Sequence, residues 1–421
     1  MRQAFWACLF HENFGFTTKQ NPMNKSTHFS GQPTFVQIVR LMPKDLVARA
    51  ISQNGSDYCT KRFNTWSHLL TMIFSCCAHC DSIREVITGM RAMGGKLKNC
   101  DLSSLPARST LSDANSKRDA KVFEDIYFNL KAHFDGLFPD SPSKKDSVYI
   151  IDSTTIKLFQ EIFKGSGMSK GDGRRKGGLK VHMAVLESDP NPSIIHLSPG
   201  ASNDGIFIKH LDFPQGSTVI MDMGYRNFKQ FNQWTKESIN WVTRLHPHTS
   251  YEIMNRNKVT KKEKKAGVKS DTIIRMGSDQ SKAEKVKCRL IRFKSLETGK
   301  TFSFITNDLS SLPSIIAATY KKRWGIELLF KRLKQNMPLK YFLGDNQNAI
   351  KIQVWCAMIT DLLLQVIRRQ VKRKWAFSNI VKLIRLHLFN YLNLFSFLEN
   401  PEKNIVRTTA EDYQLDLKLS G

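Results

Sequence analysis

Three acidic residues in this chain have positions from which they could bind metal ions. Asp152 follows the apolar run VYII and Asp222 follows TVIM, so each acid ends a predicted strand. Glu327 lies in YKKRWGIELLFKRLK, which has the apolar spacing of a helix. Mg²⁺ prefers oxygen ligands, and cleavage of a phosphodiester uses two such ions roughly 3.5 to 4 Å apart. The three acids therefore predict a metal-dependent site for phosphoryl transfer that needs no cysteine or histidine nucleophile.

Glu327 shares a predicted helix face with a tyrosine and two cations. Arg323, Glu327 and Lys334 lie three, seven and fourteen residues after Tyr320. At 100° per residue the four side chains fall within about 60° of one another. An ion-paired surface stripe explains the charges but gives no reason for the tyrosine. A carboxylate surrounded by phosphate-binding groups suits a metal-bound DNA end better.

Other residues offer competing interpretations of the site. Asp152 and Asp222 each precede residues typical of caps and turns, so either acid alone could be structural. Asp204, in the turn GASNDG, is an alternative second ligand, although a capping role fits that turn better. His182, inside VHMAVL, is expected to be a buried core histidine rather than a ligand.

The segment GSGMSKGDGRRKGG is rich in glycine and basic residues. It lacks the Gly-Lys-Ser/Thr of a phosphate-binding loop and does not match a dinucleotide fingerprint. We expect it to form a loop near Asp152 in which Arg174 and Arg175 contact DNA.

The strongest compositional signal is charge. The 421 residues include 64 Lys and Arg against 37 Asp and Glu, which gives a net charge of +27. An excess of this size on a chain with ordinary apolar content favours a nucleic-acid partner. We expect no membrane span, since the longest apolar stretch, from Val354 to Ile367, contains Asp361 and Gln365. The N-terminal residues also lack the features of a secretion signal, and these absences favour the bacterial cytoplasm, with nucleoid association when DNA is bound.

Four residues, Cys76, Cys77, His79 and Cys80, are close enough in sequence to form half of a zinc site. No second ligand pair follows at the spacing of a zinc finger, and the surrounding TWSHLLTMIFSCCAHC has a helical apolar pattern. We therefore favour core packing over metal binding for this cluster, with the cysteines reduced.

The apolar pattern predicts an α/β protein with a mixed central sheet flanked by helices. Helical spacing occupies the N-terminal part, short branched strands follow, and a strongly basic stretch with strand-like pieces precedes the Glu327 helix. Within that stretch, KVTKKEKKAGVK is expected to be a mobile basic loop. The predicted regions are a leader without regular structure at 1–27, an N-terminal helical DNA-binding domain at 28–145, a catalytic core at 146–245 and 306–345, a basic β-rich insertion at 246–305, and a C-terminal helical region with a tail at 346–421.

The pattern Y-x2-R-x3-E-x6-K, from Tyr320 to Lys334, resembles the signature of DDE insertion-sequence transposases of the IS-four family. Flanking segments are also similar to that family: IDSTTIKL around Asp152 and DMGYRNF around Asp222. The resemblance covers roughly 148–340. The segment STLSDANSKRD is similar to the N-terminal domain of one branch of the family.

This resemblance implies an RNase H-like core with a β-rich insertion and a DNA transposase that cleaves transposon ends and joins them to target DNA. Asp152, Asp222 and Glu327 would bind Mg²⁺, for which Mn²⁺ would substitute. The implied partners are double-stranded DNA, as terminal inverted repeats and target, and a second copy of the chain in a homodimer on paired ends. The implied DNA contacts are Tyr320, Arg323, Lys331 and Lys334.

One feature departs from the family. Some relatives hold a flipped base with a tryptophan of the insertion, but no tryptophan occurs between His246 and Thr319. The candidates for this role are Tyr251, Phe293 and Phe302, with Trp241 just before the insertion.

Two other functions compete with an active transposase. A transposase-derived protein that binds DNA without catalysis would have no need of all three acids. A metal-dependent nuclease unrelated to transposition would share the acids but leaves the one-sided arrangement of Tyr320, Arg323 and Lys334 unexplained.

Overall fold

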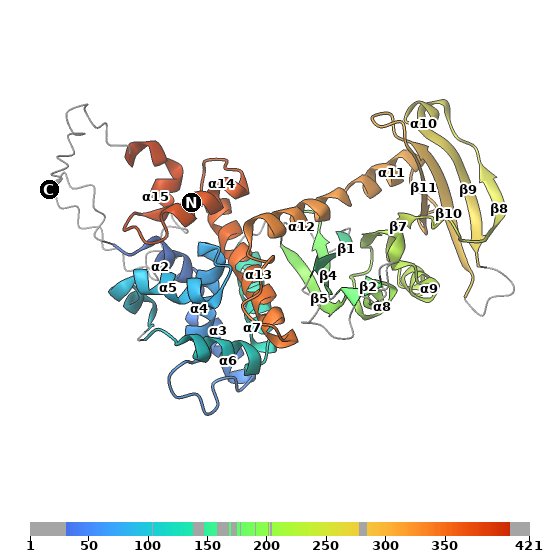
Figure 1. The fold of residues 1–421 in the computed structure, drawn as a ribbon. Helices are drawn as coiled ribbons and strands as arrows, with labels where there is room; N and C mark the ends of the chain where they lie inside the picture. The colour runs from blue at the N-terminus through green and yellow to red at the C-terminus, as the bar shows by residue number, and fades with distance from the viewer. Residues whose placement is uncertain are drawn as a thin grey trace, which may run out of the picture.

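The computed structural model describes residues 31–102, 104–137, 147–157, 168–169, 175–176, 178–189, 191–200, 202, 204–277 and 284–404. A helical body and a long mixed sheet lie side by side, and two end-to-end helices, α11 (Pro313–Lys321) and α12 (Trp324–Asn336), extend between them (Figure 1). The predicted leader at 1–27 lies outside the described residues.

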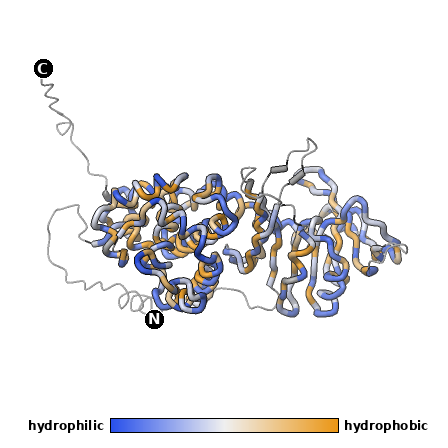
Figure 2. The backbone as a smooth tube through the Cα atoms, turned by 60° about the horizontal axis from the view of Figure 1, so that its bottom comes forward, coloured by the Kyte–Doolittle hydropathy of each residue, from blue (hydrophilic) through white to orange (hydrophobic). Residues whose placement is uncertain are grey.

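The helical body is built from both ends of the chain. Helix α13 (Gln347–Gln370) packs against α4 (Thr65–Ala78), α6 (Arg108–Lys117) and α7 (Lys121–Leu137). The regions predicted as 28–145 and 346–421 therefore share one core, and the hydrophobic parts of the chain run through its interior (Figure 2). The remaining helices of this body are α2 (Thr34–Val39), α3 (Lys44–Gln53), α5 (Ile83–Ala92), η1 (Gly94–Cys100), α14 (Phe377–Leu386), α15 (Leu394–Glu399) and η4 (Pro401–Asn404).

Helix α13 has the length and hydropathy of a membrane span, but its apolar surface is used inside the protein. Of its most apolar window, 94% is buried. The polar residues predicted to interrupt it, Asp361 and Gln365, are buried as well. This is the behaviour of a core helix that neighbouring helices cover on every side.

The cysteine cluster lies within this core, as the sequence predicted. Cys76 and Cys77 are buried in α4, Cys80 follows the helix, and all three are free thiols. Burial raises the pKa of Cys76 to about 12 and that of Cys80 to about 11, so the thiols stay protonated at neutral pH.

The sheet has nine strands in the order β5-β4-β1-β6-β7-β11-β10-β9-β8. Strands β1, β6 and β7 are parallel to one another, and every other neighbouring pair is antiparallel. Two short helical segments, α8 (Asp204–Phe207) and η2 (Ile208–His210), connect β5 to β6, and the short η3 (Met223–Tyr225) and helix α9 (Phe228–Lys236) connect β6 to β7. The strands are β1 (Val148–Lys157), β4 (Gly178–Leu186), β5 (Pro192–Pro199), β6 (Thr218–Met221), β7 (Asn240–Arg244), β8 (Tyr251–Asn257), β9 (Val268–Met276), β10 (Val286–Lys294) and β11 (Thr301–Thr306), with β2 (Met168–Ser169) and β3 (Arg175–Lys176) as a separate hairpin.

The strands inserted between Asp222 and Glu327 extend the central sheet, because β11 pairs with β7. The prediction of a mobile loop at KVTKKEKKAGVK is wrong, since this segment contains helix α10 (Lys261–Lys265). The Thr260 side chain caps the helix, and the buried Glu263 carboxylate accepts hydrogen bonds from the backbone N–H and hydroxyl of Ser314, each at 2.8 Å. Glu263 thereby connects the insertion to the first turn of α11. The charge pattern of the lysine-rich segment alone could not reveal this long-range contact.

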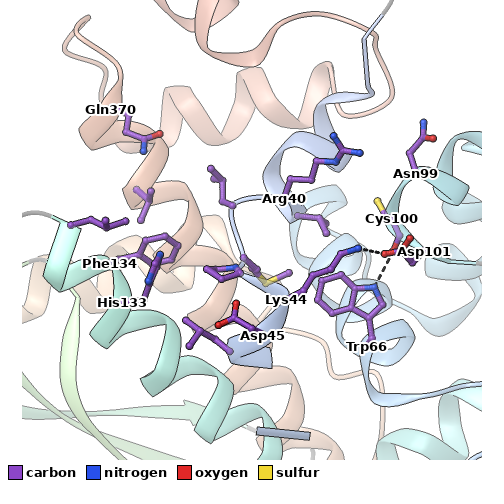
Figure 3. A pocket seen from close by; sticks show the side chains of 17 residues that line it. Arg40, Lys44, Asp45, Trp66, Asn99, Cys100, Asp101, His133, Phe134 and Gln370 are labelled. Carbon is purple, nitrogen blue, oxygen red and sulfur yellow. Dashed lines mark hydrogen bonds and ion pairs between the residues drawn. The ribbon is translucent and has the colours of Figure 1, made fainter. Parts of the chain in front are cut away.

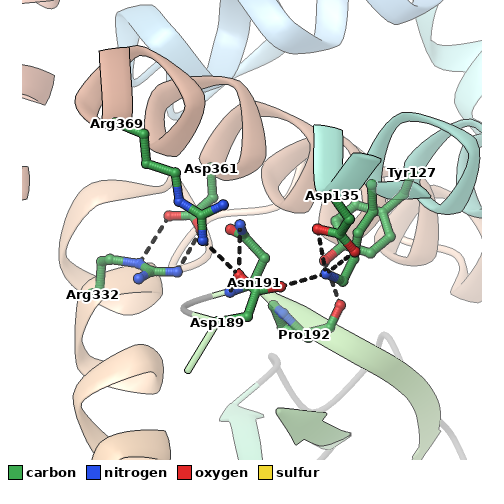
Figure 4. A network of polar contacts seen from close by, with 9 residues as sticks. Tyr127, Asp135, Asp189, Asn191, Pro192, Arg332, Asp361 and Arg369 are labelled. Carbon is green, nitrogen blue, oxygen red and sulfur yellow. Dashed lines mark hydrogen bonds and ion pairs between the residues drawn. The ribbon is translucent and has the colours of Figure 1, made fainter. Parts of the chain in front are cut away.

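Buried ion pairs attach the sheet to the helical body (Figure 4). Arg332 of α12 donates to Asp361 of α13 at 2.7 and 3.1 Å, and the Asp361 side chain is only 1% exposed. Asp189, in the turn between β4 and β5, accepts from Lys131 of α7 at 2.5 Å and from Arg369 of α13 at 2.9 Å. The Arg332–Asp361 pair holds the helix of Glu327 against α13. The Arg369–Asp189 pair holds the turn between β4 and β5 against the same helix.

A cavity of about 770 Å³ opens on the helical body between α3, α7 and α13 (Figure 3). Lys44 and Asp101 form an exposed ion pair at its edge, and the Trp66 indole N–H donates to the carbonyl of Cys100 at 3.0 Å. The cavity is separate from the three candidate metal ligands.

Candidate active site

Two of the predicted ligands, Asp152 and Asp222, lie side by side because of the sheet register. The parallel register pairs Ile150 of β1 with Ile220 of β6, and Ile220 with Val242 of β7. Side chains two residues apart in a strand share a face. Asp152, Asp222 and Arg244 each lie two residues beyond this row, so they form a second row on the face that α11 and α12 cover.

Asp152 lies in the middle of its strand, not at the end as predicted. Strand β1 continues to Lys157 because its antiparallel partner β4 remains paired with it through Gly178. The parallel partner β6 ends at Met221, opposite Ile151. Asp152 is therefore the first residue of β1 that extends beyond β6, which opens the space in front of its carboxylate.

Glu327 lies in the first turn of α12, and the predicted single helix is interrupted before it. Backbone hydrogen bonds at Lys322, Arg323, Gly325 and Ile326 connect to residues three positions earlier, so a tight turn separates α11 from α12. The four signature residues consequently do not share one regular helix face. Glu327 still lies near Asp152, because the Arg323 guanidinium hydrogen-bonds to both carboxylates.

Two arginines bind the three acids. The Arg323 guanidinium donates to Asp152 at 2.7 Å through Nη1 and to Glu327 at 2.5 Å through Nη2. The Arg244 guanidinium donates to Asp222 at 2.8 Å. A single planar cation thus bridges the strand acid and the helix acid, which brings the predicted first and third ligands to one place.

The acidity of Asp152 is perturbed by its surroundings. Burial, with a smaller contribution from the charges of Asp222 and Glu327, raises its pKa to about 6 against the lowering effects of the Ser153 N–H and of Arg323. The mutual repulsion among the acids is a second indication that they form one cluster. An added cation would relieve that repulsion.

The predicted DNA contacts differ in how exposed they are and in whether the structure describes their side chains. Tyr320 is buried beside Phe304, with ring centroids 4.9 Å apart, and Arg323 lies on the acids. Lys331 and Lys334 are exposed on α12 beyond Glu327. Arg174 lies outside the described residues. Arg175 is in strand β3, where only the backbone is described.

Asp204, the alternative second ligand, lies beside Ser153 and Gly224. Its carboxylate accepts from Lys180 at 3.0 Å and from the Ser153 hydroxyl at 3.3 Å. A Cβ at Gly224 would lie 3.2 Å from Asp204 and 4.0 Å from Asp222, so this glycine separates the two acids. Asp204 therefore already has a cation of its own, Lys180.

His182 is a core residue, as predicted. It is 1% exposed, and its ring nitrogens hydrogen-bond to Tyr225 at 3.1 Å and to Ser198 at 2.9 Å. Burial lowers its pKa to about 4, so the ring is neutral at physiological pH.

Trp241 cannot hold a flipped base, contrary to its place among the candidates. It is 0% exposed and stacks on Phe231 at 4.3 Å within the second core cluster. The strand alternation that turns Val242 toward α11 turns Trp241 to the opposite face. Tyr251, Phe293 and Phe302 are half-buried on the insertion and remain candidates for holding a flipped base.

Arg244 is a residue of the site that the sequence analysis did not single out. It is the last residue of strand β7, and a single arginine at a strand end carries no distinguishing signal in a sequence. Its importance follows from the register that aligns it with Asp152 and Asp222.

The donor set suits a hard divalent cation. Carboxylate oxygens from Asp152, Asp222 and Glu327 are the ligands such ions prefer, and the space between Asp152 and Glu327 already accommodates a cationic guanidinium. Among the described residues, no three acidic, histidine or cysteine side chains lie close enough to one another to hold a metal ion together. In this structure Asp152 and Glu327 are paired with Arg323, and Asp222 is paired with Arg244.

The mixed sheet, the clustered acids and the basic composition are consistent with an enzyme that acts on DNA. The Transposase DDE domain family matches residues 143–360, just over half of the chain. The chain belongs to this family and is a DNA transposase, an enzyme that cleaves and joins DNA. Domains of this family generally use divalent metal ions. Residues 30–100 match a second family, described as a domain of unknown function.

Relatives of the chain carry transposase names. A protein of Sinorhizobium fredii (strain NBRC 101917 / NGR234), named as transposase y4zB, is 29% identical over 66% of this chain and 76% of its own length. A protein of Synechocystis sp. (strain ATCC 27184 / PCC 6803 / Kazusa), named for insertion sequence element IS4SA, is 26% identical over 62% and 71%. A piggyBac transposase synaptic complex with hairpin DNA gives a TM-score of 0.43 at 10% identity, over 90% of this chain and 83% of that one, a likeness too weak to carry an argument.

The raised pKa of Asp152 predicts how metal affinity depends on pH. A proton and a metal ion compete for this carboxylate, so affinity should fall about tenfold per pH unit below a pH of about 6 and level off above it. We expect the half-saturating metal concentration for DNA cleavage to rise about fivefold from about pH 6 to about pH 5, because about half of the Asp152 carboxyl groups are already protonated at about pH 6. An unchanged value across this interval would contradict the assignment of Asp152 as a ligand.

Proposed function

We propose that the enzyme cleaves the ends of a transposon and joins them to target DNA by two-metal-ion phosphoryl transfer with Asp152, Asp222 and Glu327 as ligands. The observation that carries the proposal is the Arg323 bridge between Asp152 and Glu327, with Asp222 in register on the next strand. Mg²⁺ is the proposed ion, with Mn²⁺ as a substitute, because the donors are all carboxylates. When bound, the ions would activate the attacking oxygen and stabilise the leaving oxygen.

The strand order supports an RNase H-like core. Three antiparallel strands, β5, β4 and β1, are followed by the parallel strands β6 and β7, and the acids lie on β1, after β6 and on a helix across the sheet. The signature from Tyr320 to Lys334 supports placement in the IS-four branch. The β-rich insertion that follows β7 agrees with that placement.

The chain's own residues would orient the DNA. Arg323 would exchange its carboxylate partners for phosphates once cations neutralise the acids, since a guanidinium forms paired hydrogen bonds with either group. Lys331 and Lys334 lie on exposed positions of the same helix, and Arg174 and Arg175 are proposed to reach the DNA from the β2–β3 region. The proposed substrates are terminal inverted repeats and target duplexes, held by a homodimer in the bacterial cytoplasm.

The test is cleavage of a supercoiled plasmid that carries the element's own ends, with Mg²⁺ present. We expect excision at both ends and covalently joined products, detected by sequencing across the new junctions. Degradation without joined ends would favour a nuclease unrelated to transposition. Binding without cleavage would favour the alternative function, a transposase-derived protein that has lost catalysis.

A further inference from the structure

The end of helix α13 carries a dense group of cations that none of the proposed DNA contacts includes. From Leu362 to Leu398 the chain has seven lysines and arginines and no acidic residue. We propose that the basic turn, residues 368–374, binds backbone phosphates of the target DNA duplex. This inference rests on the proposed function and gives a place to the second of its two DNA substrates. The cations of the basic turn, in the segment RRQVKRK, are Arg368, Arg369, Lys372, Arg373 and Lys374.

Contacts with neighbouring segments fix the backbone of the basic turn. The Glu399 carboxylate, at the end of α15, accepts hydrogen bonds from the backbone N–H groups of Lys372 at 2.5 Å and Arg373 at 3.3 Å. The Arg373 side chain pairs with Glu402 at 2.8 Å. Arg369 reaches from α13 to the turn between β4 and β5 (Figure 4). These contacts order the main chain of the basic turn and employ two of its five cations.

The other three cations are left for a partner. Arg368, Lys372 and Lys374 are exposed, and within the part of the chain that the structure describes, the ion pairs of this turn are made by Arg369 and Arg373 instead. A cation in the last turn of a helix stabilises the helix dipole, which accounts for Arg368 but not for the two lysines beyond the end of α13. Cations held this close together suit a partner with closely spaced negative charges, and duplex DNA carries one charge per about 1.7 Å of its axis.

A groove beside α12 connects the basic turn to the candidate active site. Leu328, the residue after Glu327, and Arg368 line the same cavity of about 270 Å³. Ile150, two residues before Asp152 on β1, also lines it. The Leu328 side chain is 53% exposed, so the groove is open to solvent next to the third candidate ligand. A duplex whose phosphate lies at the acids therefore extends toward the basic turn.

The position of the basic turn favours target DNA over the transposon end. Joining brings both duplexes to the same acids, so they must leave the site in different directions. The inserted strands, which carry the candidates for holding a flipped base of the end, lie beyond β7 (Figure 1). The β4–β5 turn, which Arg369 holds, lies toward the opposite end of the sheet, and the acids on β1 and after β6 lie between them. The basic turn is therefore on the side of the acids that the insertion does not occupy.

The test separates joining from cleavage. The triple variant Arg368→Gln, Lys372→Gln, Lys374→Gln is compared with the wild type in joining pre-cleaved end-bearing duplexes to a supercoiled plasmid. The half-saturating plasmid concentration should rise about tenfold or more, whereas cleavage of ends in a donor plasmid should stay within about twofold of the wild type.

Salt dependence gives a second readout. Each phosphate contact contributes about 0.9 to the slope of log affinity against log salt concentration. For three contacts, the wild type with bound ends should lose about fortyfold more affinity for a labelled target duplex than the triple variant does between about 50 and 200 mM salt. Fluorescence anisotropy of the target duplex measures this difference.

The matched control removes three charges from the opposite face of the sheet. Lys209, Lys229 and Lys236 are exposed on η2 and α9, whose apolar residues pack on the face away from α12. The control variant Lys209→Gln, Lys229→Gln, Lys236→Gln has the same net charge as the first triple variant. It should keep the wild-type half-saturating plasmid concentration and the wild-type salt dependence.

A charge-preserving variant separates phosphate binding from a structural role. Arg368→Lys, Lys372→Arg, Lys374→Arg keeps three cations and should bind target DNA like the wild type. Thermal unfolding establishes that each variant is folded. If the glutamine triple variant is not, Lys372→Gln and Lys374→Gln are measured singly, and each must lower the salt slope by about 0.9.

The outcomes separate this inference from the proposed function. If joining and cleavage fall by the same factor, the basic turn acts on the donor DNA or on the fold, and the target assignment is overturned. Unchanged joining and an unchanged salt slope in the folded triple variant also overturn it. If the wild type joins no ends to any target, the proposed function fails and the inference fails with it.

Discussion

Glu327→Gln should abolish DNA cleavage while leaving DNA binding intact. The amide keeps the shape of the side chain but removes the negative charge that a divalent cation requires, and the loss of one ligand should slow cleavage by about a thousandfold or more, which corresponds to roughly 4 kcal/mol. Binding should persist because the change also releases Arg323 from its contact with Glu327, which leaves this cation available to phosphate. The measurements are plasmid cleavage and a gel-shift titration with end-bearing duplex.

The matched control for this variant is Glu252→Gln. Glu252 is a surface residue of β8 whose side chain is 71% exposed, so the same loss of charge occurs far from the acids. The control should cut at the wild-type rate. If Glu327→Gln also cuts at that rate, Glu327 is not the third ligand.

Asp361→Ala should cause the largest loss of stability among single changes at the junction of sheet and helices. It leaves the Arg332 guanidinium of α12 without its buried counter-charge, and removing one partner of a buried pair costs roughly 3 to 5 kcal/mol. Cleavage should fall as well, because Glu327 lies on the same helix, α12, five residues before Arg332, and a loosened α12 would displace it. Denaturant unfolding followed by circular dichroism gives the free energy, and plasmid cleavage gives the activity.

The double variant Arg332→Met with Asp361→Leu separates charge from packing. Replacing both partners with apolar residues of similar volume removes the uncompensated charge, so stability should return to near the wild-type value. If the double variant is no more stable than Asp361→Ala, the loss arises from packing of α13 and not from the ion pair. If cleavage remains low after stability returns, the Arg332–Asp361 contact orients the helix of Glu327.

The fold class could be read from local patterns because apolar periodicity is a property of neighbouring residues. The strand containing Asp152, the strand that precedes Asp222 and the helix containing Glu327 were all predicted near their observed positions. The errors occur where a distant partner decides the structure. Helix α10 forms at a lysine-rich segment because Glu263 bonds to Ser314, and Trp241 is buried because its strand face packs on α9.

The sequence by itself determined the residue types of the chemistry: three acids next to apolar runs, a tyrosine and cations at signature spacing, and a large positive charge. The tertiary structure alone decided how they meet. Strand register aligned Arg244 with Asp152 and Asp222, the turn before α12 placed Arg323 on two carboxylates, and α13 joined the two ends of the chain into one helical body. The physical reason is that register and packing depend on contacts between residues far apart in the chain, which periodicity and spacing along the sequence do not contain.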